Sequence, residues 1–372
     1  MINSGSGRLL NAKQLLLVIA GLSILLLLLF VAGKYPDFIE ANYSNGLYRW
    51  ICRIWHFLLA WVPFSIGDVF YTAIILLALW FISTLIRKLI HRQYRQAGLG
   101  LLKFIIGLQL FIAAFYLLWG MNYFRPPAAR ILSLQDSTYT FGQLQTVTRL
   151  LIDSTNANRR ALTSLQQSQS NKTIYQNAVL AAKQLTNRHP ALLSFYPAAK
   201  SSLFTPVINY MGTAGYFNPF SGEAQVNYAM PVVNRPITAC HEMAHQMGFA
   251  REDEANFVGF LAGERSTDPL LKYSAYYMAM QEFMDQVYRR DTVVYHQLKT
   301  CIAQPVKNDI KADRLYWEHY QNQMGYLSSL FYDRFLKINN QPEGLRTYNR
   351  MINLTMAYYQ KKSNHAPRKT GL

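Results

Sequence analysis

Charged side chains are scarce in this sequence. They make up 15% of the 372 residues, whereas a typical soluble protein has about 25%, and hydrophobic residues make up 51%. This combination excludes a disordered or fibrous chain and indicates that part of the protein lies outside water. Acidic residues are the scarcer charge, with 20 Asp and Glu against 37 Lys and Arg. Because the basic residues form no run of five and no zinc-finger pattern, we expect anionic lipid, and no nucleic acid, as their partner.

Cysteine is also scarce, and Cys52, Cys240 and Cys301 include no CxxC pair. So few cysteines exclude a disulfide scaffold. We expect buried free thiols, because unpaired cysteine behaves as a small hydrophobic residue. A disulfide between Cys240 and Cys301 is the alternative in an oxidising compartment.

Long uncharged runs are abundant near the N-terminus. A hydrocarbon core of about 30 Å needs about 20 helical residues, and residues 15–33, 69–86 and 104–120 approach that length without a charge. The first run is not expected to be a cleaved signal peptide, since no small-x-small cleavage site follows it before Lys34. We predict three transmembrane helices within a membrane region of residues 1–122.

Residues 47–64 are predicted to lie along the membrane surface and not to cross it. The segment is rich in tryptophan, but Arg49, Arg53 and His56 leave an uncharged core of only residues 57–64. This pattern is typical of an interfacial helix that tryptophan anchors and whose arginines reach toward water.

The charges of the loops predict the orientation. Residues 87–103 hold five basic residues and no acidic one, so the positive-inside rule places this loop in the cytoplasm. The N-terminus is then also cytoplasmic, and residues 123–372 form an extracytoplasmic domain. We expect an integral protein of the bacterial inner membrane.

Beyond residue 123 the pattern is mainly helical. Between residues 206 and 233 it becomes short and β-like, with several glycines and prolines. Apolar residues recur at helical spacing over residues 141–153, 174–185, 236–247, 252–264 and 270–289. The predicted fold class is therefore mainly α, a three-span transmembrane N-terminal region followed by a predominantly helical domain with a small β-sheet.

The motif that indicates chemistry is His241-Glu242-Met243-Ala244-His245. An HExxH is expected by chance only about 0.004 times in a chain of this composition. On a helix, His241 and His245 lie on one face, where both imidazoles reach one metal ion. Glu242 is placed to act on a metal-bound water as general base. We predict a site for one Zn²⁺ with two histidine ligands and Glu242 as the catalytic residue.

A catalytic zinc site needs a third protein ligand. Gly248 ends the predicted helix, and Glu252 and Glu254 open the next one. Glu252 is the first candidate, because Asn256 lies one turn later and is placed to support a histidine ligand. Glu254 is the alternative. Acidic residues in a first turn also interact favourably with the helix dipole, so their charge alone does not establish a ligand.

The HExxH followed by Glu252-Asp253-Glu254-Ala255-Asn256 resembles the gluzincin metallopeptidases, notably the integral-membrane proteases that cleave prenylated proteins and their heat-shock relatives. The resemblance implies a zincin-like domain in which His241, His245 and Glu252 bind zinc, Glu242 is the base and Asn256 supports a ligand. Three features differ. Asn256 replaces a family aspartate, the spacing from His245 to Glu252 is much shorter, and Arg251 stands where the metzincin pattern HExxHxxGxxH has its third histidine.

More widely, the sequence resembles an uncharacterised family of bacterial membrane proteins that combine three N-terminal spans with an HExxH domain. The segments that carry this resemblance are residues 119–127, 219–227 and 241–257. It extends over nearly the whole chain and implies no substrate.

Two further elements are predicted at the site. Ala224, Gln225 and Val226 belong to a predicted strand just before the metal helix, where gluzincins hold an edge strand that pairs with the substrate. An ordinary sheet strand is equally compatible with the pattern. Candidates for stabilising the oxyanion are Tyr348, Arg350 and His319.

The predicted function is a membrane-anchored zinc metallopeptidase that hydrolyses peptide or protein substrates in the cell envelope. The alternative is a membrane sensor or scaffold whose metal site is structural or vestigial. Glu242 disfavours that alternative, because a structural site needs no base. A transporter is disfavoured because the predicted spans have no ionisable residue at mid-membrane.

Overall fold

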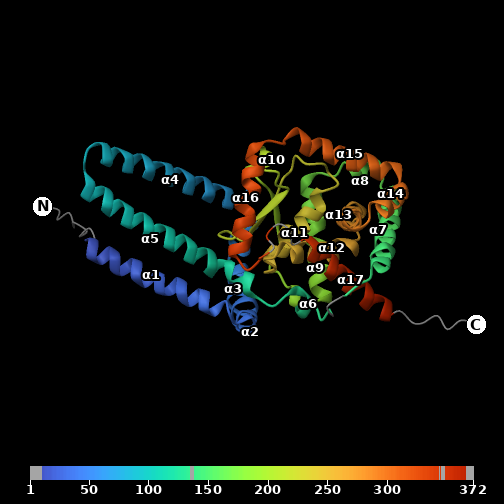
Figure 1. Cartoon of the computed structure of the whole chain (residues 1–372), viewed down its shortest axis with the longest axis horizontal. Helices are drawn as coiled ribbons and strands as arrows, with labels where there is room; N and C mark the ends of the chain where they lie inside the picture. Colours follow the sequence, from blue (N-terminus) through green and yellow to red (C-terminus); the bar gives the residue numbers. More distant parts are fainter. Residues whose placement is uncertain (1–10, 135–137, 343, 345–347, 366–372) are drawn as a thin grey trace, which may run out of the picture.

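The computed structural model describes residues 11–134, 138–342, 344 and 348–365. Over these residues the protein is mainly helical and has one three-stranded sheet. Figure 1 shows three long helices at one end of the molecule and a helical domain at the other. The predicted fold class is confirmed at this level.

Three helices are long and apolar enough to cross a membrane, namely α1 (Ala12–Ala32), α4 (Ile66–Ile90) and α5 (Tyr94–Leu118). Most of their large apolar side chains are exposed, as expected where lipid replaces water. α1 packs along α5, and α4 also contacts α5. The chain is therefore a membrane protein, and each predicted span corresponds to one of these helices.

The two ends of the three membrane helices lie at different distances from the domain. The start of α1 and the turn between α4 and α5 lie far from the domain, whereas the end of α5 and the start of α4 adjoin it (Figure 1). This arrangement is compatible with the expectation that the N-terminus and residues 87–103 share one side of the membrane. Which side faces the cytoplasm stays a prediction.

The connection between α1 and α4 packs against the domain. It consists of α2 (Pro36–Phe38), the π-helix η1 (Ile39–Leu47) and α3 (Tyr48–Leu59). One face of α3 is buried against the domain through Tyr48, Cys52 and His56, and the opposite face exposes Trp50, Ile54 and Phe57, with Trp61 exposed in the turn that follows. The segment predicted to be interfacial therefore presents a continuous apolar face, and its depth in a bilayer stays a prediction.

The centre of the domain is the pair α11 (Arg235–Gln246) and α12 (Glu252–Glu264). The two helices approach closely at Gly259, where a Cβ atom would lie 3.2 Å from the backbone nitrogen of His241. α9 (Asn171–Arg188) and α13 (Pro269–Arg290) pack against this pair. The other helices of the domain are η2 (Gly120–Phe124), α6 (Ala128–Ile131), α7 (Phe141–Ala161), α8 (Ser164–Gln167), η3 (Pro190–Leu192), α10 (Thr205–Tyr210), α14 (Thr292–Thr300), α15 (Gln304–His319), α16 (Gln323–Ile338) and α17 (Tyr348–His365).

The sheet has the strand order β1-β3-β2, with β1 (Ala199–Ser201) parallel and β2 (Gly215–Asn218) antiparallel to β3 (Glu223–Val226). The predicted edge strand at Ala224, Gln225 and Val226 is β3, which lies in the middle of the sheet, so this prediction is wrong. The chain turns after β2 and pairs β3 with it, while β1, earlier in the sequence, pairs with the other side of β3. β2 is the edge strand on the side of the hairpin.

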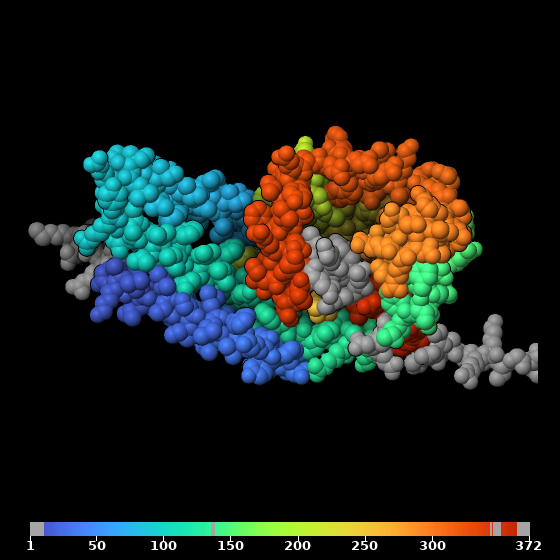
Figure 2. All heavy atoms as spheres, viewed as in Figure 1, coloured from blue at the N-terminus to red at the C-terminus, as the bar shows by residue number. Residues whose placement is uncertain are grey.

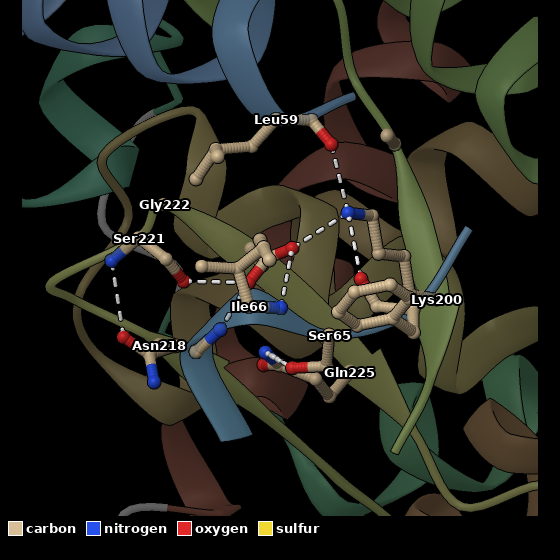
Figure 3. Close-up of polar contacts among 12 residues, drawn as sticks. Leu59, Ser65, Ile66, Lys200, Asn218, Ser221, Gly222 and Gln225 are labelled. Carbon is tan, nitrogen blue, oxygen red and sulfur yellow. Dashed lines mark hydrogen bonds and ion pairs between the residues drawn. The ribbon is translucent and has the colours of Figure 1, made fainter. Parts of the chain in front are cut away.

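A buried polar network joins α4 to the sheet (Figure 3). The carboxylate of Glu223 accepts a hydrogen bond from the backbone N–H of Gly67 at 2.6 Å, in the first turn of α4. The same carboxylate pairs with Lys200 Nζ at 2.6 Å. Lys200 in turn donates to the carbonyl oxygen of Leu59 at 2.8 Å, where α3 ends. Because a carboxylate is favourable at a helix N-terminus, this network fixes the domain end of α4 against the sheet.

All three cysteines are free, as predicted. Cys52 and Cys240 are buried, and Cys301 is half-buried. The alternative disulfide is wrong, because Cys240 lies on α11 whereas Cys301 ends α14, where its thiol donates to the carbonyl oxygen of Gln297.

Candidate metal centre

Two histidines converge on one point at the end of α11. His241 and His245 lie one turn apart, and their Nε2 atoms are 3.2 Å from each other. α11 ends where Gly248 adopts a φ of +82°, a conformation that favours glycine. A Cβ atom at Gly248 would also lie 2.9 Å from Asn122 Oδ1. The sharp turn after Gly248 brings the next helix back across the histidines.

The third group is Glu252, the first residue of α12. Its carboxylate oxygens lie 3.2 Å from His241 Nε2 and 3.7 Å from His245 Nε2. A tetrahedral Zn²⁺ with bonds of 2.0–2.2 Å separates its ligand atoms by about 3.4 Å. The donor atoms of this cluster therefore have the types and separations that zinc requires.

Hydrogen bonds orient both imidazoles toward this point. His241 Nδ1 lies 2.7 Å from Asn256 Oδ1, and His245 Nδ1 lies 2.7 Å from the carbonyl oxygen of Phe249. Because a carbonyl oxygen accepts, and an amide oxygen does too, each Nδ1 donates to its partner and each Nε2 faces the centre. Asn256 therefore occupies the supporting position that we predicted for it.

Glu242 lies beside this cluster without being part of it. It is 3% exposed, and its Oε2 has no hydrogen-bond partner among the described residues. Burial raises the pKa of Glu242 to about 8. Gly215 of β2 leaves room for this carboxylate, since a Cβ atom there would lie 2.8 Å from Glu242 Oε1. An unpartnered carboxylate beside metal-ligating groups is placed to bind a water molecule.

The charges of the cluster are coupled. Burial raises the pKa of Glu252, but the hydrogen bond with His241 and the charges of both histidines outweigh burial and hold that pKa at about 2. Burial lowers the pKa of His245 to about 4, so this ring is neutral at pH 7. The site thus holds the carboxylate of Glu252 and the neutral imidazole of His245, the forms in which these side chains bind metals. The hydrogen bond with Glu252 and the charges of Glu242 and Glu252 outweigh burial and raise the pKa of His241 to about 9, so this ring must lose a proton to bind a metal.

Glu254 does not reach the cluster. It is buried, accepts a hydrogen bond from the backbone N–H of Ala128 at 2.8 Å, and lies 4.0 Å from Arg251 Nη1. Two positions along a helix turn the side chain well away from that of Glu252. The cluster therefore includes Glu252 and not the alternative ligand Glu254.

Tyr332 of α16 is the site residue that sequence reasoning missed. Its hydroxyl donates a hydrogen bond to Glu252 Oε1. Burial of the hydroxyl and the nearby charge of Glu252 raise the pKa of Tyr332 well above its ordinary value, which keeps it protonated. The residue lies 80 positions after Glu252 and is one of 25 tyrosines, so no local pattern distinguishes it.

The predicted oxyanion candidates fare differently. His319 is exposed at the end of α15, where its ring contacts Tyr320. No contact between His319 and the cluster is found among the described residues, and its role stays a prediction. The end of α15 lies at the surface, and the spacing of residues along the sequence does not predict where a helix end lies in the fold. The side chains of Tyr348 and Arg350 lie outside the described residues.

Residues next to the membrane helices hold the end of α11. The indole N–H of Trp119, which follows α5, donates to the carbonyl oxygen of His245 at 3.0 Å. Tyr48 of α3 donates to the carbonyl oxygen of Gln246 at 3.0 Å, and Arg125 donates to that of Gly248 at 3.0 Å. These donors satisfy carbonyl groups that a helix C-terminus leaves unpaired. The metal centre is thereby attached directly to the membrane region.

Comparison with known proteins gives one match. A family model described as a protein of unknown function (DUF3810) matches residues 43–356. No curated protein and no solved structure matches the chain.

Proposed function

Because the chain belongs to the DUF3810 family, whose description states no function, we propose from its site alone that it is a membrane-anchored zinc metallopeptidase. The observation that carries the proposal is the convergence of His241, His245 and Glu252 beside the unpartnered carboxylate of Glu242. Two imidazoles and one carboxylate leave a fourth position for water, as in catalytic zinc sites and unlike closed structural ones.

Two residues of the chain have separate roles in the proposed reaction. A bound zinc ion supplies Lewis acidity to the scissile carbonyl and lowers the pKa of water to about 7. Glu242 accepts the proton of the attacking water and returns it to the leaving amine. Tyr332 donates a hydrogen bond to the negative charge that develops on the carbonyl oxygen. The sequence predicts this role for Tyr348, Arg350 and His319.

An extended peptide fits along β2 and not along β3. β2 is the edge strand next to the site, where Gly215 adjoins Glu242 and the ring of Phe217 lies 6.2 Å from that of His245. Extended peptides commonly bind by adding a strand to a sheet edge, where backbone groups are free to pair. β3 has partners on both sides and offers no such edge.

Two features of the whole chain support an envelope substrate. The basic loop at residues 87–103 favours a cytoplasmic position, and the domain lies at the opposite end of the membrane helices (Figure 1). Together these features support a site outside the cytoplasm, at the outer surface of the inner membrane. Peptides or proteins of the cell envelope are the substrates within its reach.

The test of the proposal compares E242Q with the parent protein purified in detergent. We expect E242Q to bind zinc at the same stoichiometry and to lose hydrolysis of a mixed peptide library, because the amide cannot accept the proton. E318Q, at an exposed position on α15, is the matched control and should cleave normally. Zinc in both proteins without hydrolysis by the parent would instead support the sensor or scaffold alternative.

A further inference from the structure

Helix α16 has an apolar face that the rest of the described chain leaves largely exposed. Its members recur every three or four residues, so they line one side of the helix. They are Met324, Leu327, Phe331, Phe335 and Ile338, with exposed fractions of 51%, 53%, 72%, 38% and 76%. We call this set the α16 stripe. Contiguous exposed apolar surface of this kind marks a contact with a partner or a membrane.

The opposite side of α16 fixes the orientation of the helix. Tyr332 reaches Glu252 at the metal centre, and Leu336 is fully buried. Gly325 lies against the domain, where a Cβ atom would be 3.2 Å from the carbonyl oxygen of Tyr210. Since three positions along α16 contact the domain, the helix cannot rotate to bury the α16 stripe.

The α16 stripe begins beside the membrane helices. The ring of Phe335 lies 5.9 Å from that of Phe115, which is in the last turn of α5. Just after α16, Asn339 accepts a hydrogen bond from the hydroxyl of Tyr116 at 3.1 Å. Figures 1 and 2 show α16 running across the domain ends of the membrane helices and not parallel to them. Through Phe335 the stripe therefore adjoins the apolar surface of α5 at the domain end of that helix.

The neighbouring side chains suit a membrane surface. Arg334 and Lys337 flank the α16 stripe and are exposed, and long basic side chains reach from an apolar surface to water or lipid headgroups. Lys337 also pairs with Asp333 at 2.6 Å. A helix with one apolar face, flanking basic residues and an axis across the membrane helices has the features of an interfacial helix.

We propose that the α16 stripe lies in the interfacial region of the outer lipid leaflet, so that α16 binds lipid with one face and presents Tyr332 to the metal centre with another. The bilayer is the occupant because the stripe continues the apolar surface of α5. This inference does not depend on the proposed peptidase activity. It makes α16 a second membrane-surface helix in addition to α3, which was predicted to be one.

The experiment places an environment-sensitive fluorophore on the α16 stripe. F331C is labelled in a C301S background, in which the remaining cysteines are buried, and the full chain is reconstituted in phosphatidylethanolamine–phosphatidylglycerol nanodiscs. L79C on α4 serves as the lipid control, and L165C on α8, 81% exposed on the domain, as the aqueous control. We expect doxyl-labelled lipid to quench F331C nearly as strongly as L79C, and iodide to quench it several-fold less than L165C.

Two outcomes would overturn the proposal. Iodide quenching of F331C equal to that of L165C, without quenching by doxyl lipid, would place the stripe in water. Efficient oxidative crosslinking of F331C between two copies would identify a second chain as the occupant. Because Phe331 is 72% exposed, its replacement removes no core contact, and a normal melting temperature of F331C checks this point.

Discussion

Glu252 and Glu254 show how two positions on a helix separate chemical roles. Glu252 lies at the metal centre, where both histidines hold its pKa at about 2. Glu254 is buried away from the cluster, where burial and the charge of Asp253 raise the pKa of Glu254 to about 7. Both are acidic residues in the first turn of α12, so the direction in which each side chain points decides its surroundings.

We therefore expect E252Q and E254Q to differ in zinc binding. E252Q removes a charged ligand, so zinc affinity should fall by at least about 10–100-fold. E254Q keeps an oxygen that accepts from the N–H of Ala128, so its zinc affinity should stay close to that of the parent. Chelator competition measures both values, and equal loss in the two variants would contradict the ligand assignment.

Tyr332 is a second residue whose role depends on the direction in which its side chain points. We expect Y332F to retain zinc and to lower kcat by about 10²–10³-fold, the usual effect of removing one oxyanion donor. Y326F is the matched control on the same helix, since Tyr326 is 66% exposed. Steady-state kinetics separates kcat from KM. An unchanged kcat in Y332F would exclude Tyr332 as the donor.

At the scale of elements, the start of α4 is joined to the sheet by a buried ion pair. Lys200 and Glu223 are 7% and 5% exposed in their side chains, and both also bind backbone groups of the membrane region. Removing one partner of such a pair leaves a buried charge without compensation. The pair therefore makes the position of a membrane helix depend on two residues of the domain.

We expect E223A to lower the free energy of unfolding by about 3–5 kcal/mol, because Lys200 stays buried without its partner. D285A is the control, since the Arg289–Asp285 pair is exposed and such pairs contribute about 0–1 kcal/mol. Thermal unfolding in one detergent compares the variants. Equal melting temperatures would show that water replaces Glu223 without cost.

In the molecule as a whole, the candidate metal centre lies close to the domain end of the membrane helices. Trp119 follows α5 directly and donates to the carbonyl oxygen of His245. α3 and α16 both approach the same end of the domain (Figure 1). The proposed peptidase would therefore meet its substrates near the bilayer surface, and the side of the membrane would decide which proteins those are.

Protease accessibility in cells stripped of any outer barrier tests that side. A tag placed after Leu372 should be digested, whereas a tag in residues 87–103 should survive, because the five basic residues of that loop favour the cytoplasm. A cytoplasmic marker protein controls for lysis. The reverse pattern would place the metal centre in the cytoplasm and remove envelope proteins from the possible substrates.

Features that depend on neighbouring positions could be predicted from the sequence. Three uncharged runs predict three apolar helices because bilayer thickness requires a minimum length, and HExxH places His241 and His245 on one face because a helix repeats every 3.6 residues. The position of Glu252 follows in the same way from Gly248, because the short turn leaves few directions in which the next helix can run.

Features that join distant segments depend on how the chain packs in three dimensions. The middle position of β3, the approach of Tyr332 to Glu252 and the pairing of Lys200 with Glu223 all depend on how helices and strands pack. Packing directions arise from the summed contacts of many side chains, and no spacing along the chain records them. For this reason the cluster of His241, His245 and Glu252 was predictable from local pattern, whereas the edge strand and the tyrosine at the site were not.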